Sequence, residues 1–454
     1  MRKATHINEI DQAVNKFEPV PFRHEFYTNF DGVRGDFQMR ELCRIMNITQ
    51  EGDEYVFNAA LNRSNKTFLF LAGMRGTGKT SELAKYARLF NGPKCFFTVV
   101  CNIDQELDMD KVQYMDVLIF QLQKLIEQAD KAGLNVNAQI VDSMNKWFGE
   151  RVREINKSLA VAGSAEIEFD PGQTGIGGRV LSALLGVTAK LKAGLQGSTE
   201  RADKIRESFK NNFTDYAPKF NEFMEEVNQQ LRAQGIAREV LFIIDGLEKT
   251  FSAEQRRRLI LEESNRILKI KANTIFTLPV ELIKEEAIIR QFSDVLIFPF
   301  VKVEERDGTP VAAAVERYKE FVCKRIDRSL FESEAVIEKA IRYSGGSPLQ
   351  LLRILETANW SLADGQTMLD MAAIDKAISR LANQLGRNVE EKEIAQLKQL
   401  EKDLTHGKSI GFIKELQPLL EKNYVFEYND GSYKAINPLV KASAYYQQYE
   451  EKTL

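Results

Sequence analysis

One short segment of the chain combines glycines, a lysine and a hydroxyl residue at a spacing that suits phosphate. It has the pattern G-x-x-x-x-G-K-[ST], and its residues are Gly73, Met74, Arg75, Gly76, Thr77, Gly78, Lys79 and Thr80. Glycines let backbone N–H groups close around phosphate oxygens, and a following helix points the positive end of its dipole at them. In this pattern Lys79 reaches the β- and γ-phosphates and the Thr80 hydroxyl ligates Mg²⁺. This segment, the phosphate loop, therefore predicts a site for a nucleoside triphosphate with Mg²⁺.

A pair of carboxylates further along the chain could complete this chemistry. Asp245 ends the apolar run 240–244, and Glu248 follows three residues later. Hydrolysis at a phosphate loop needs a carboxylate in the Mg²⁺ shell and a group that orients the attacking water. Asp245 fits the first role and Glu248 the second. A helix N-cap for Asp245 and a solvated carboxylate for Glu248 are the simpler alternatives.

The elements around these residues predict the fold that positions them. An apolar run, 67–72, precedes the phosphate loop, and a helix-forming stretch, 81–90, follows it. Further predicted strands alternate with helices such as 111–131, and these strands are 95–103, 240–245, 273–278 and 295–301. This alternation predicts an α/β fold with a doubly wound, mainly parallel sheet. Residues 1–35 hold prolines, glycines and aromatics and predict an ordered, non-helical arm, of the kind that often packs on the adenine.

A long insertion separates the phosphate loop from Asp245. Residues 135–236 exceed what one strand and its helices need, and their flanks are charged and helical. The middle is rich in glycine and alanine and contains an apolar stretch, 180–195. We expect a helical projection with a mobile tip. For the apolar stretch, internal packing, a partner or self-assembly contact, and a membrane-surface role are the alternatives.

The C-terminal half predicts two further modules. Residues 312–385 are helical, with a break at Gly345, Gly346 and Pro348. Helices over 390–406 and 410–422 then precede two short strands around Asn429-Asp430-Gly431, a strong hairpin signal. With a closing helix, 438–446, this order predicts a winged helix. The predicted organisation is an arm (1–35), a phosphate-loop core (36–302), a helical lid (303–385) and a winged helix (386–454).

Together these motifs resemble the AAA+ and STAND branch of P-loop ATPases, with an origin-recognition-like lid and a C-terminal winged helix. The resemblance is strong only at the phosphate loop and at Asp245, and the form Asp245-Gly246-Leu247-Glu248 is similar to that of STAND proteins. It implies ATP and Mg²⁺ as ligands, with Thr80 and Asp245 on the metal. It also implies catalytic roles for Lys79, Asp245 and Glu248.

The same resemblance assigns three more residues. Thr277 matches the polar sensor at the end of the fourth strand, and Arg290 stands where the family keeps its arginine finger. A surface helix arginine is the alternative for Arg290. Pro348 replaces the arginine of the AAA+ lid motif, as in the G-x-P motif of STAND proteins, and Arg353 is a candidate substitute. Gly246 stands where most AAA+ motors have an acid, so the resemblance favours a slow switch over a continuous motor.

Composition bounds the partners. Lys and Arg number 62 and Asp and Glu 65, so the net charge of −3 does not indicate a nucleic-acid or membrane partner. The predicted recognition helix, 409–422, is almost neutral. It therefore lacks the cationic side chains that bind DNA phosphates. The densest basic cluster, Arg256-Arg257-Arg258, is either a solvated helix face or a contact for nucleic acid or a neighbouring subunit. The cysteines lack C-x-x-C spacing and predict free thiols in a reducing compartment. Without a run of 18 apolar residues, we expect a cytoplasmic protein with no membrane span.

The resulting hypothesis is an ATP-dependent molecular switch that hydrolyses slowly and acts through a protein partner or effector. The resemblance links such switches to signalling and antiphage defence in prokaryotes. An oligomeric AAA+ ATPase of the DNA-loading or transposition type is the alternative, and a non-hydrolysing scaffold is a third. Self-assembly and nucleic-acid binding stay open, the latter not favoured.

Overall fold

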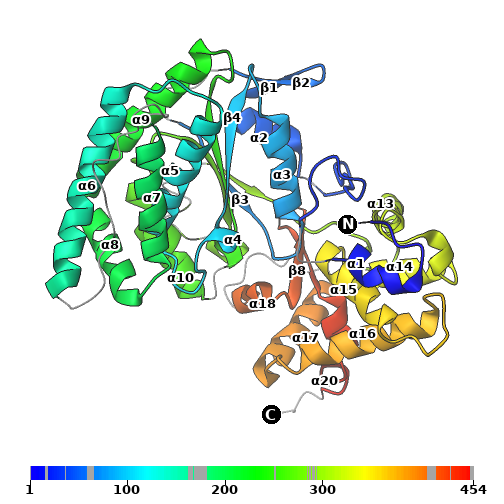
Figure 1. Cartoon of the computed structure of the whole chain (residues 1–454). Helices are drawn as coiled ribbons and strands as arrows, with labels where there is room; N and C mark the ends of the chain where they lie inside the picture. Colours follow the sequence, from blue (N-terminus) through cyan, green and yellow to red (C-terminus); the bar gives the residue numbers. More distant parts are fainter. Residues whose placement is uncertain are drawn as a thin grey trace.

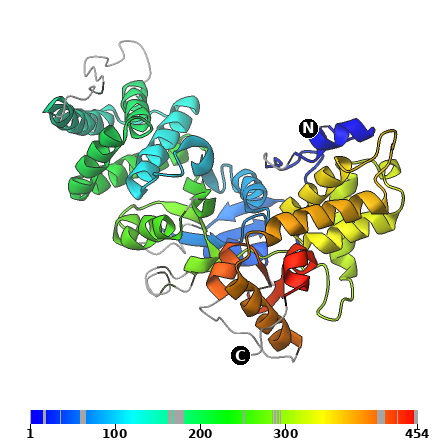
Figure 2. The ribbon, with the colours of Figure 1, turned by 90° about the horizontal axis from the view of Figure 1, so that it is seen from below.

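The structure is a computed structural model, shown in Figure 1. It describes residues 2–15, 19–35, 37–58, 66–161, 167, 181–249, 252–283, 285, 288, 292, 294–405, 416–429 and 431–449. A central sheet carries a helical insertion at one end and a second helical body at the other, as the view from below also shows (Figure 2).

The central sheet has five strands in the described part of the chain, in the order β4-β5-β6-β3-β7. Their bounds are Phe68–Ala72 (β3), Phe96–Asn102 (β4), Glu239–Asp245 (β5), Asn273–Leu278 (β6) and Asp294–Ile297 (β7). All neighbouring pairs are parallel, so the mainly parallel α/β sheet is confirmed. The last strand ends at Ile297 and not at 301, because its partner β3 ends at Ala72: the Phe298 N–H still donates to the Ala72 carbonyl, whereas the Phe300 N–H donates to the Glu427 carbonyl.

Two apolar cores cover the two faces of this sheet. Alternate residues of β3 point to opposite sides: Leu69 and Leu71 join one core, and Phe70 and Ala72 join the other. The first core is covered by α2 (Met39–Ile45) and α3 (Lys79–Leu89), and the second by α5 (Tyr114–Lys131) and α9 (Phe213–Ala233). Because both faces of the sheet are buried, its strands are continuous apolar runs in the sequence.

The insertion is a bundle of helices that shares the second core. Its helices are α6 (Ala138–Val161), α7 (Leu181–Leu195), α8 (Thr199–Asn211) and α9. The apolar stretch forms α7, whose Leu184 and Leu191 are fully buried against the rest of the bundle. Internal packing therefore accounts for its apolar side chains. The tip was predicted within the glycine- and alanine-rich middle, 160–197, of which residues 162–166 and 168–180 lie outside the described residues.

Smaller elements connect these parts. Around the sheet lie the hairpin of β1 (Ile48–Glu51) and β2 (Glu54–Phe57), α4 (Ile103–Glu106), η3 (Leu247–Lys249), α10 (Ala253–Arg257), η4 (Arg258–Glu262), α11 (Ser264–Ile267) and η5 (Val280–Leu282). The β1–β2 hairpin was not among the predicted elements. No helix in the part of the chain that the structure describes is long and apolar enough to cross a membrane.

The N-terminal arm is partly helical, so the prediction of a non-helical arm is wrong for its first part. Residues Ile7–Glu9 (η1) and Ile10–Ala13 (α1) form a short helical segment. Its Asp11 carboxylate accepts hydrogen bonds from Asn359 Nδ2 at 2.9 Å and Trp360 Nε1 at 2.7 Å. The buried Ile10 and Ala13 pack into the core of the predicted lid, and this tertiary contact favours the helix despite the turn-forming residues that follow.

The predicted lid consists of α13 (Ala312–Cys323), η6 (Arg328–Leu330), α14 (Glu334–Ser344), α15 (Pro348–Asn359) and α16 (Met371–Gly386). The break at Gly345 and Gly346 falls between α14 and α15, as predicted. After the lid, the elements are α17 (Glu391–Thr405), α18 (Gln417–Glu421), β8 (Val425–Tyr428), β9 (Tyr433–Ile436), α19 (Pro438–Ala442) and α20 (Ala444–Gln447). We call α17 to α20 the C-terminal module. Its antiparallel hairpin is confirmed, and α18 lies within the predicted helix 410–422, whose residues 410–415 lie outside the described residues.

Candidate functional site

The sheet brings the predicted chemical residues to one edge. Strand β6 lies between β3 and β5, so Thr277 at its end is next to both the phosphate loop and Asp245. In the register, Leu71 pairs with Thr277, and Asn102 pairs with Asp245. The carboxyl ends of parallel strands share an edge, where open α/β sheets place their ligands.

The backbone of the phosphate loop needs its glycines. Gly76 and Gly78 have φ values of 87° and 93°, in the left-handed region that other residues rarely adopt. Gly78 is the N-cap of α3, so the helix begins directly behind the loop. A Cβ on Gly73 would lie 2.5 Å from the Phe298 carbonyl oxygen, so the start of the loop tolerates only glycine. The loop thus presents its backbone at the N-terminus of an eleven-residue helix.

Lys79 is buried and points back into the loop. Its Nζ donates to the carbonyl oxygens of Gly73 and Met74, both at 2.8 Å, and lies 3.4 Å from Glu248 Oε1. Burial lowers the pKa of Lys79, although the negative charges of Glu248 and Asp245 act to raise it. An ammonium held by loop carbonyls is one that phosphate oxygens can recruit, because a charge-assisted bond to an anion is stronger than one to a carbonyl.

Two carboxylates lie opposite this lysine. Asp245 is buried, and burial together with the charge of Glu248 raises its pKa to about 6. For Glu248, burial would raise the pKa, but the Lys79 ammonium and the Thr277 hydroxyl outweigh it, so this pKa is lowered. The pair therefore combines one reluctantly ionised and one readily ionised carboxylate.

The donor set fits Mg²⁺. The Thr80 hydroxyl is close enough to lower the Asp245 pKa, yet neither Asp245 oxygen makes a hydrogen bond in the part of the chain that the structure describes. Two buried oxygens without a partner beside a hydroxyl are ligands that a hard cation prefers. Among the described residues, no three or more Asp, Glu, His or Cys side chains are placed so that they could hold a metal ion together. Phosphate oxygens and waters would have to complete the metal shell.

Thr277 holds the turn between these carboxylates. Its side chain is fully buried, and its Oγ1 accepts hydrogen bonds from the backbone N–H groups of Gly246 at 3.0 Å and Leu247 at 3.3 Å. Gly246 has a φ of 103°, which explains why the residue after Asp245 is glycine and not an acid. The structure thus brings together Lys79, Thr80, Asp245, Glu248 and Thr277 as the sequence predicts.

The phosphate loop also touches both C-terminal parts. Ser347 Oγ donates to the Gly76 carbonyl at 3.4 Å, and Asn423 Nδ2 donates to the Arg75 carbonyl at 3.5 Å. Met74 is 4% exposed, and its side chain belongs to the apolar core of the C-terminal module. Met74 therefore has its carbonyl bound by Lys79 and its side chain bound by the C-terminal module.

Arg34, a buried residue of the N-terminal arm, was not among the predicted site residues. Its Nη1 donates to the carbonyls of Thr77 at 3.1 Å and Pro299 at 2.8 Å, and its guanidinium lies 4.0 Å from the ring centre of Phe298. Arg34 thus fastens the phosphate loop to the chain beyond β7. No local pattern marks it, because its partners are distant in sequence.

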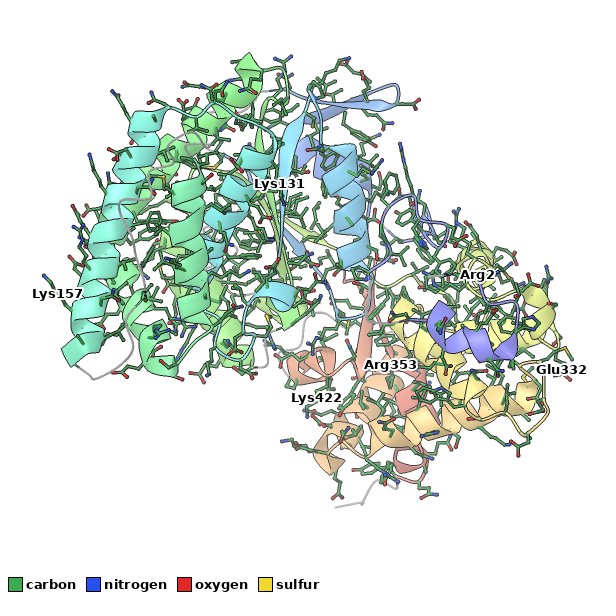
Figure 3. The ribbon with its side chains drawn as sticks, in the orientation of Figure 1. Arg2, Lys131, Lys157, Glu332, Arg353 and Lys422 are labelled. Atoms are coloured by element: carbon green, nitrogen blue, oxygen red, sulfur yellow. The ribbon has the colours of Figure 1, made fainter. Side chains whose placement is uncertain are left out.

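The remaining predicted residues are less central. Pro348 is the first residue of α15, and its neighbours Ser347 and Leu349 would be within 3.2 Å of a Cβ on Gly76. Arg353 is exposed, and Figure 3 labels it. Arg290 lies outside the described residues. The assignments of Arg290 and Pro348 therefore stay predictions.

The charged residues considered for nucleic acid are paired within the chain. Arg256 lies 3.9 Å from Glu421, Arg257 pairs with Glu285, and Arg258 lies 3.0 Å from Glu254. Lys422 lies 2.6 Å from Glu393. These pairs favour an ordinary helix face over a phosphate-binding patch. The four cysteines are free, and burial raises the pKa of the Cys95 thiol to about 12, which makes it unreactive.

Comparisons with known proteins add little. No family model matches the chain, and no curated protein matches it. Among solved structures, a Walker-type ATPase of Pyrococcus abyssi is similar at 14% identity, over 94% of this chain and 98% of that one, with a TM-score of 0.40. A likeness this weak carries no argument about activity, so the functional case depends on the site residues themselves.

Proposed function

We propose that the protein is an ATP-dependent switch that binds Mg²⁺·ATP at the phosphate loop, hydrolyses it slowly and reports the nucleotide state through its C-terminal module. The observation that carries this proposal is the double attachment of Met74. Its carbonyl oxygen binds Lys79, the phosphate-seeking group, and its side chain lies in the core of the C-terminal module. Signalling or antiphage defence, through a protein partner, is the biological setting that the resemblance supplies.

The chain's own residues divide the chemistry. Backbone N–H groups of the phosphate loop and Lys79 bind the phosphates, and Thr80 and Asp245 would hold Mg²⁺, which supplies charge neutralisation at the transferred phosphoryl group. Glu248 Oε2 has no hydrogen-bond partner among the described residues, and its other oxygen faces Lys79. Its lowered pKa keeps it ionised, as required to accept a hydrogen bond from an attacking water.

The coupling step follows from the competition for Lys79. When phosphate recruits the ammonium, the carbonyls of Gly73 and Met74 lose the Lys79 donor, and the Met74 carbonyl keeps its hydrogen bond from the Thr77 hydroxyl at 3.1 Å. The loop must then readjust, and Met74 transmits the change because its side chain is fixed in another core. Packed interfaces tend to shift between discrete arrangements instead of deforming gradually. Nucleotide binding and the docking of the C-terminal module are therefore linked.

Two substitutions test the chemistry. Lys79→Ala should weaken ATP binding by about 100-fold or more, since it removes a charge-assisted contact of about 3 kcal/mol. Glu248→Gln should keep ATP binding and lower the rate of phosphate release. Calorimetry and a phosphate assay measure both, and Lys94→Ala, a half-exposed lysine paired with Glu54, is the control that should change neither. The absence of binding heat with ATP in the unaltered protein would contradict the proposal.

A third substitution tests the coupling. Met74→Ala should accelerate hydrogen exchange in residues 416–449 without nucleotide and remove the effect of ATP on that exchange. Met144→Ala is the matched control, because Met144 is equally buried but lies in the insertion. If ATP leaves exchange in residues 416–449 unchanged in the unaltered protein, the site binds nucleotide without operating this switch.

A further inference from the structure

A third carboxylate lies beside the Asp245–Glu248 pair, on a neighbouring strand. Asp104 is in the first turn of α4, directly after β4, and β4 pairs with β5 so that Asn102 stands opposite Asp245. A Cβ on Gly246 would be 3.0 Å from Asp104 Oδ1. Asp104 therefore fills the space next to Gly246, where the resemblance would place an acid.

The Asp104 carboxylate binds a lysine next to the turn between Asp245 and Glu248. Lys249 follows Glu248 in η3, and its Nζ lies 2.7 Å from Asp104 Oδ2. The pair is mostly sheltered, since the side chains of Lys249 and Asp104 are 31% and 24% exposed. The Lys249 carbonyl also accepts a hydrogen bond from Arg75 Nη2 at 3.2 Å, which ties η3 to the phosphate loop.

Lys249 lies within the electrostatic field of the carboxylate pair without bonding to it. Burial would lower the Lys249 pKa, but the charge of Asp245 and the bond to Asp104 outweigh it, so this pKa is raised. Both Asp245 oxygens and Glu248 Oε2 nevertheless lack hydrogen-bond partners in the described residues. The ammonium is instead bound by Asp104, and the charges of Asp245 and Glu248 would attract it if that bond were removed.

Helix α4 is held in place at its other end. The Glu106 carboxylate pairs with Lys124 of α5 at 2.7 Å and with Lys192 of α7, and Gln196 Nε2 donates to the Glu106 carbonyl at 2.6 Å. These contacts fix α4 between the core and the insertion. Asp104 is thus a preorganised acceptor, and Lys249 is kept where it is by a fixed partner.

We propose that Asp104 is a positioning residue that holds the Lys249 ammonium off the Asp245–Glu248 pair and so keeps that pair open to Mg²⁺. This inference rests on the proposed function, because it concerns the metal step of the same site. Without Asp104, Lys249 binds the carboxylates and competes with the metal. ATP binding in the absence of Mg²⁺ does not involve this competition.

The test measures the Mg²⁺ concentration at half-maximal enhancement of ATP binding, by calorimetry, in the unaltered protein, Asp104→Asn, Lys249→Met and the double variant. Asp104→Asn should raise this midpoint about tenfold, the effect of one charge-assisted contact. ATP affinity in EDTA should stay the same. The double variant should return to the unaltered midpoint, because the competing ammonium is gone. Asp104→Ser gives the same comparison if Asp104→Asn does not fold, as judged by thermal unfolding in EDTA.

The outcomes separate the two proposals. A midpoint that stays raised in the double variant means that Asp104 acts only by supporting α4, and it overturns the inference. An unchanged midpoint in Asp104→Asn overturns it as well. If the unaltered protein binds no ATP at any Mg²⁺ concentration, the proposed function fails first.

Discussion

The carboxyl edge of the sheet and the helical insertion both bury charged side chains, but the two regions treat them differently. Where the insertion meets α5, Arg206 of α8 forms a bidentate ion pair with Asp116. Its Nε lies 3.0 Å from Oδ1 and its Nη2 lies 2.6 Å from Oδ2. At the sheet edge, both oxygens of the equally buried Asp245 lack a partner among the described residues. Burial raises the pKa of both carboxylates, but removing the partner of Asp116 would leave an uncompensated buried charge, whereas a buried carboxylate that has no partner in the fold is typical of a ligand site.

The first prediction removes the partner in the paired region. Arg206→Met should lower the free energy of unfolding by about 3–5 kcal/mol, because Asp116 is left buried without its cation. Nucleotide affinity should be unchanged in protein that is still folded. Denaturant unfolding and calorimetry measure the two quantities.

A control and a rescue sharpen this prediction. Lys204→Met, on the same helix, breaks an exposed pair with Glu207 and should cost less than about 1 kcal/mol. Adding Asp116→Leu to Arg206→Met should restore most of the stability, since no charge is then buried. If the single variant is as stable as the unaltered protein, the pair has no structural role.

The second prediction removes the charge in the unpaired region. The pKa of Asp245 is about 6 in the folded protein, against an ordinary value of 3.8. The protonated Asp245 therefore contributes to the stability of the fold below pH 3.8, and this contribution is lost as the pH rises through 6. Asp245→Asn should therefore stabilise the protein in EDTA at pH 8 by about 3 kcal/mol. The gain should shrink as the pH falls from 6 to 4.

The matched control has the opposite sign. Asp116→Asn should destabilise the protein at pH 8, because it breaks the pair with Arg206. Thermal unfolding of both variants over this pH range makes the comparison, and Asp245→Asn should also lose Mg²⁺-dependent ATP binding. Destabilisation by Asp245→Asn would show that Asp245 stabilises the fold. It would then have a structural role, as in the alternative that Asp245 is a helix N-cap.

The local pattern was enough to predict the elements that carry the site. The strand before the phosphate loop, the helix after it and the strand that ends at Asp245 are continuous segments whose periodicity is legible, and the structure confirms them. The side-by-side placement of Thr277 and Asp245 was also accessible, because parallel strands end at one edge.

What the pattern did not show depends on contacts between distant segments. Met74 occupies an unrestricted position of its motif, and only the docking of the C-terminal module makes its side chain part of a core. Arg34 binds carbonyls that are 43 and 265 residues away. Asp104 had a usable signal, since it follows a buried strand, but its pairing with Lys249 requires the order of strands in the sheet.

The smallest expected effect comes from a pair of helix caps, one in the predicted lid beside the phosphate loop and one in the insertion. Ser347 caps α15 by accepting from Gln350 N–H, and Ser198 caps α8 by accepting from Arg201 N–H. Replacing either serine by alanine should cost about 1 kcal/mol of stability. Only Ser347 also donates to the phosphate loop, at the Gly76 carbonyl.

Ser347→Ala should therefore change ATP affinity by about three- to tenfold, as expected for one hydrogen bond of about 1 kcal/mol, and Ser198→Ala should leave it unchanged. The direction of the change is informative. Tighter binding means that the Ser347 contact restrains the loop in the nucleotide-free form, and weaker binding means that the contact supports the loop around phosphate. Equal affinities in the two variants would show that α15 contacts the loop without controlling it, which would leave the contacts of the C-terminal module, through Met74 and Asn423, as the link between the phosphate loop and the C-terminal half.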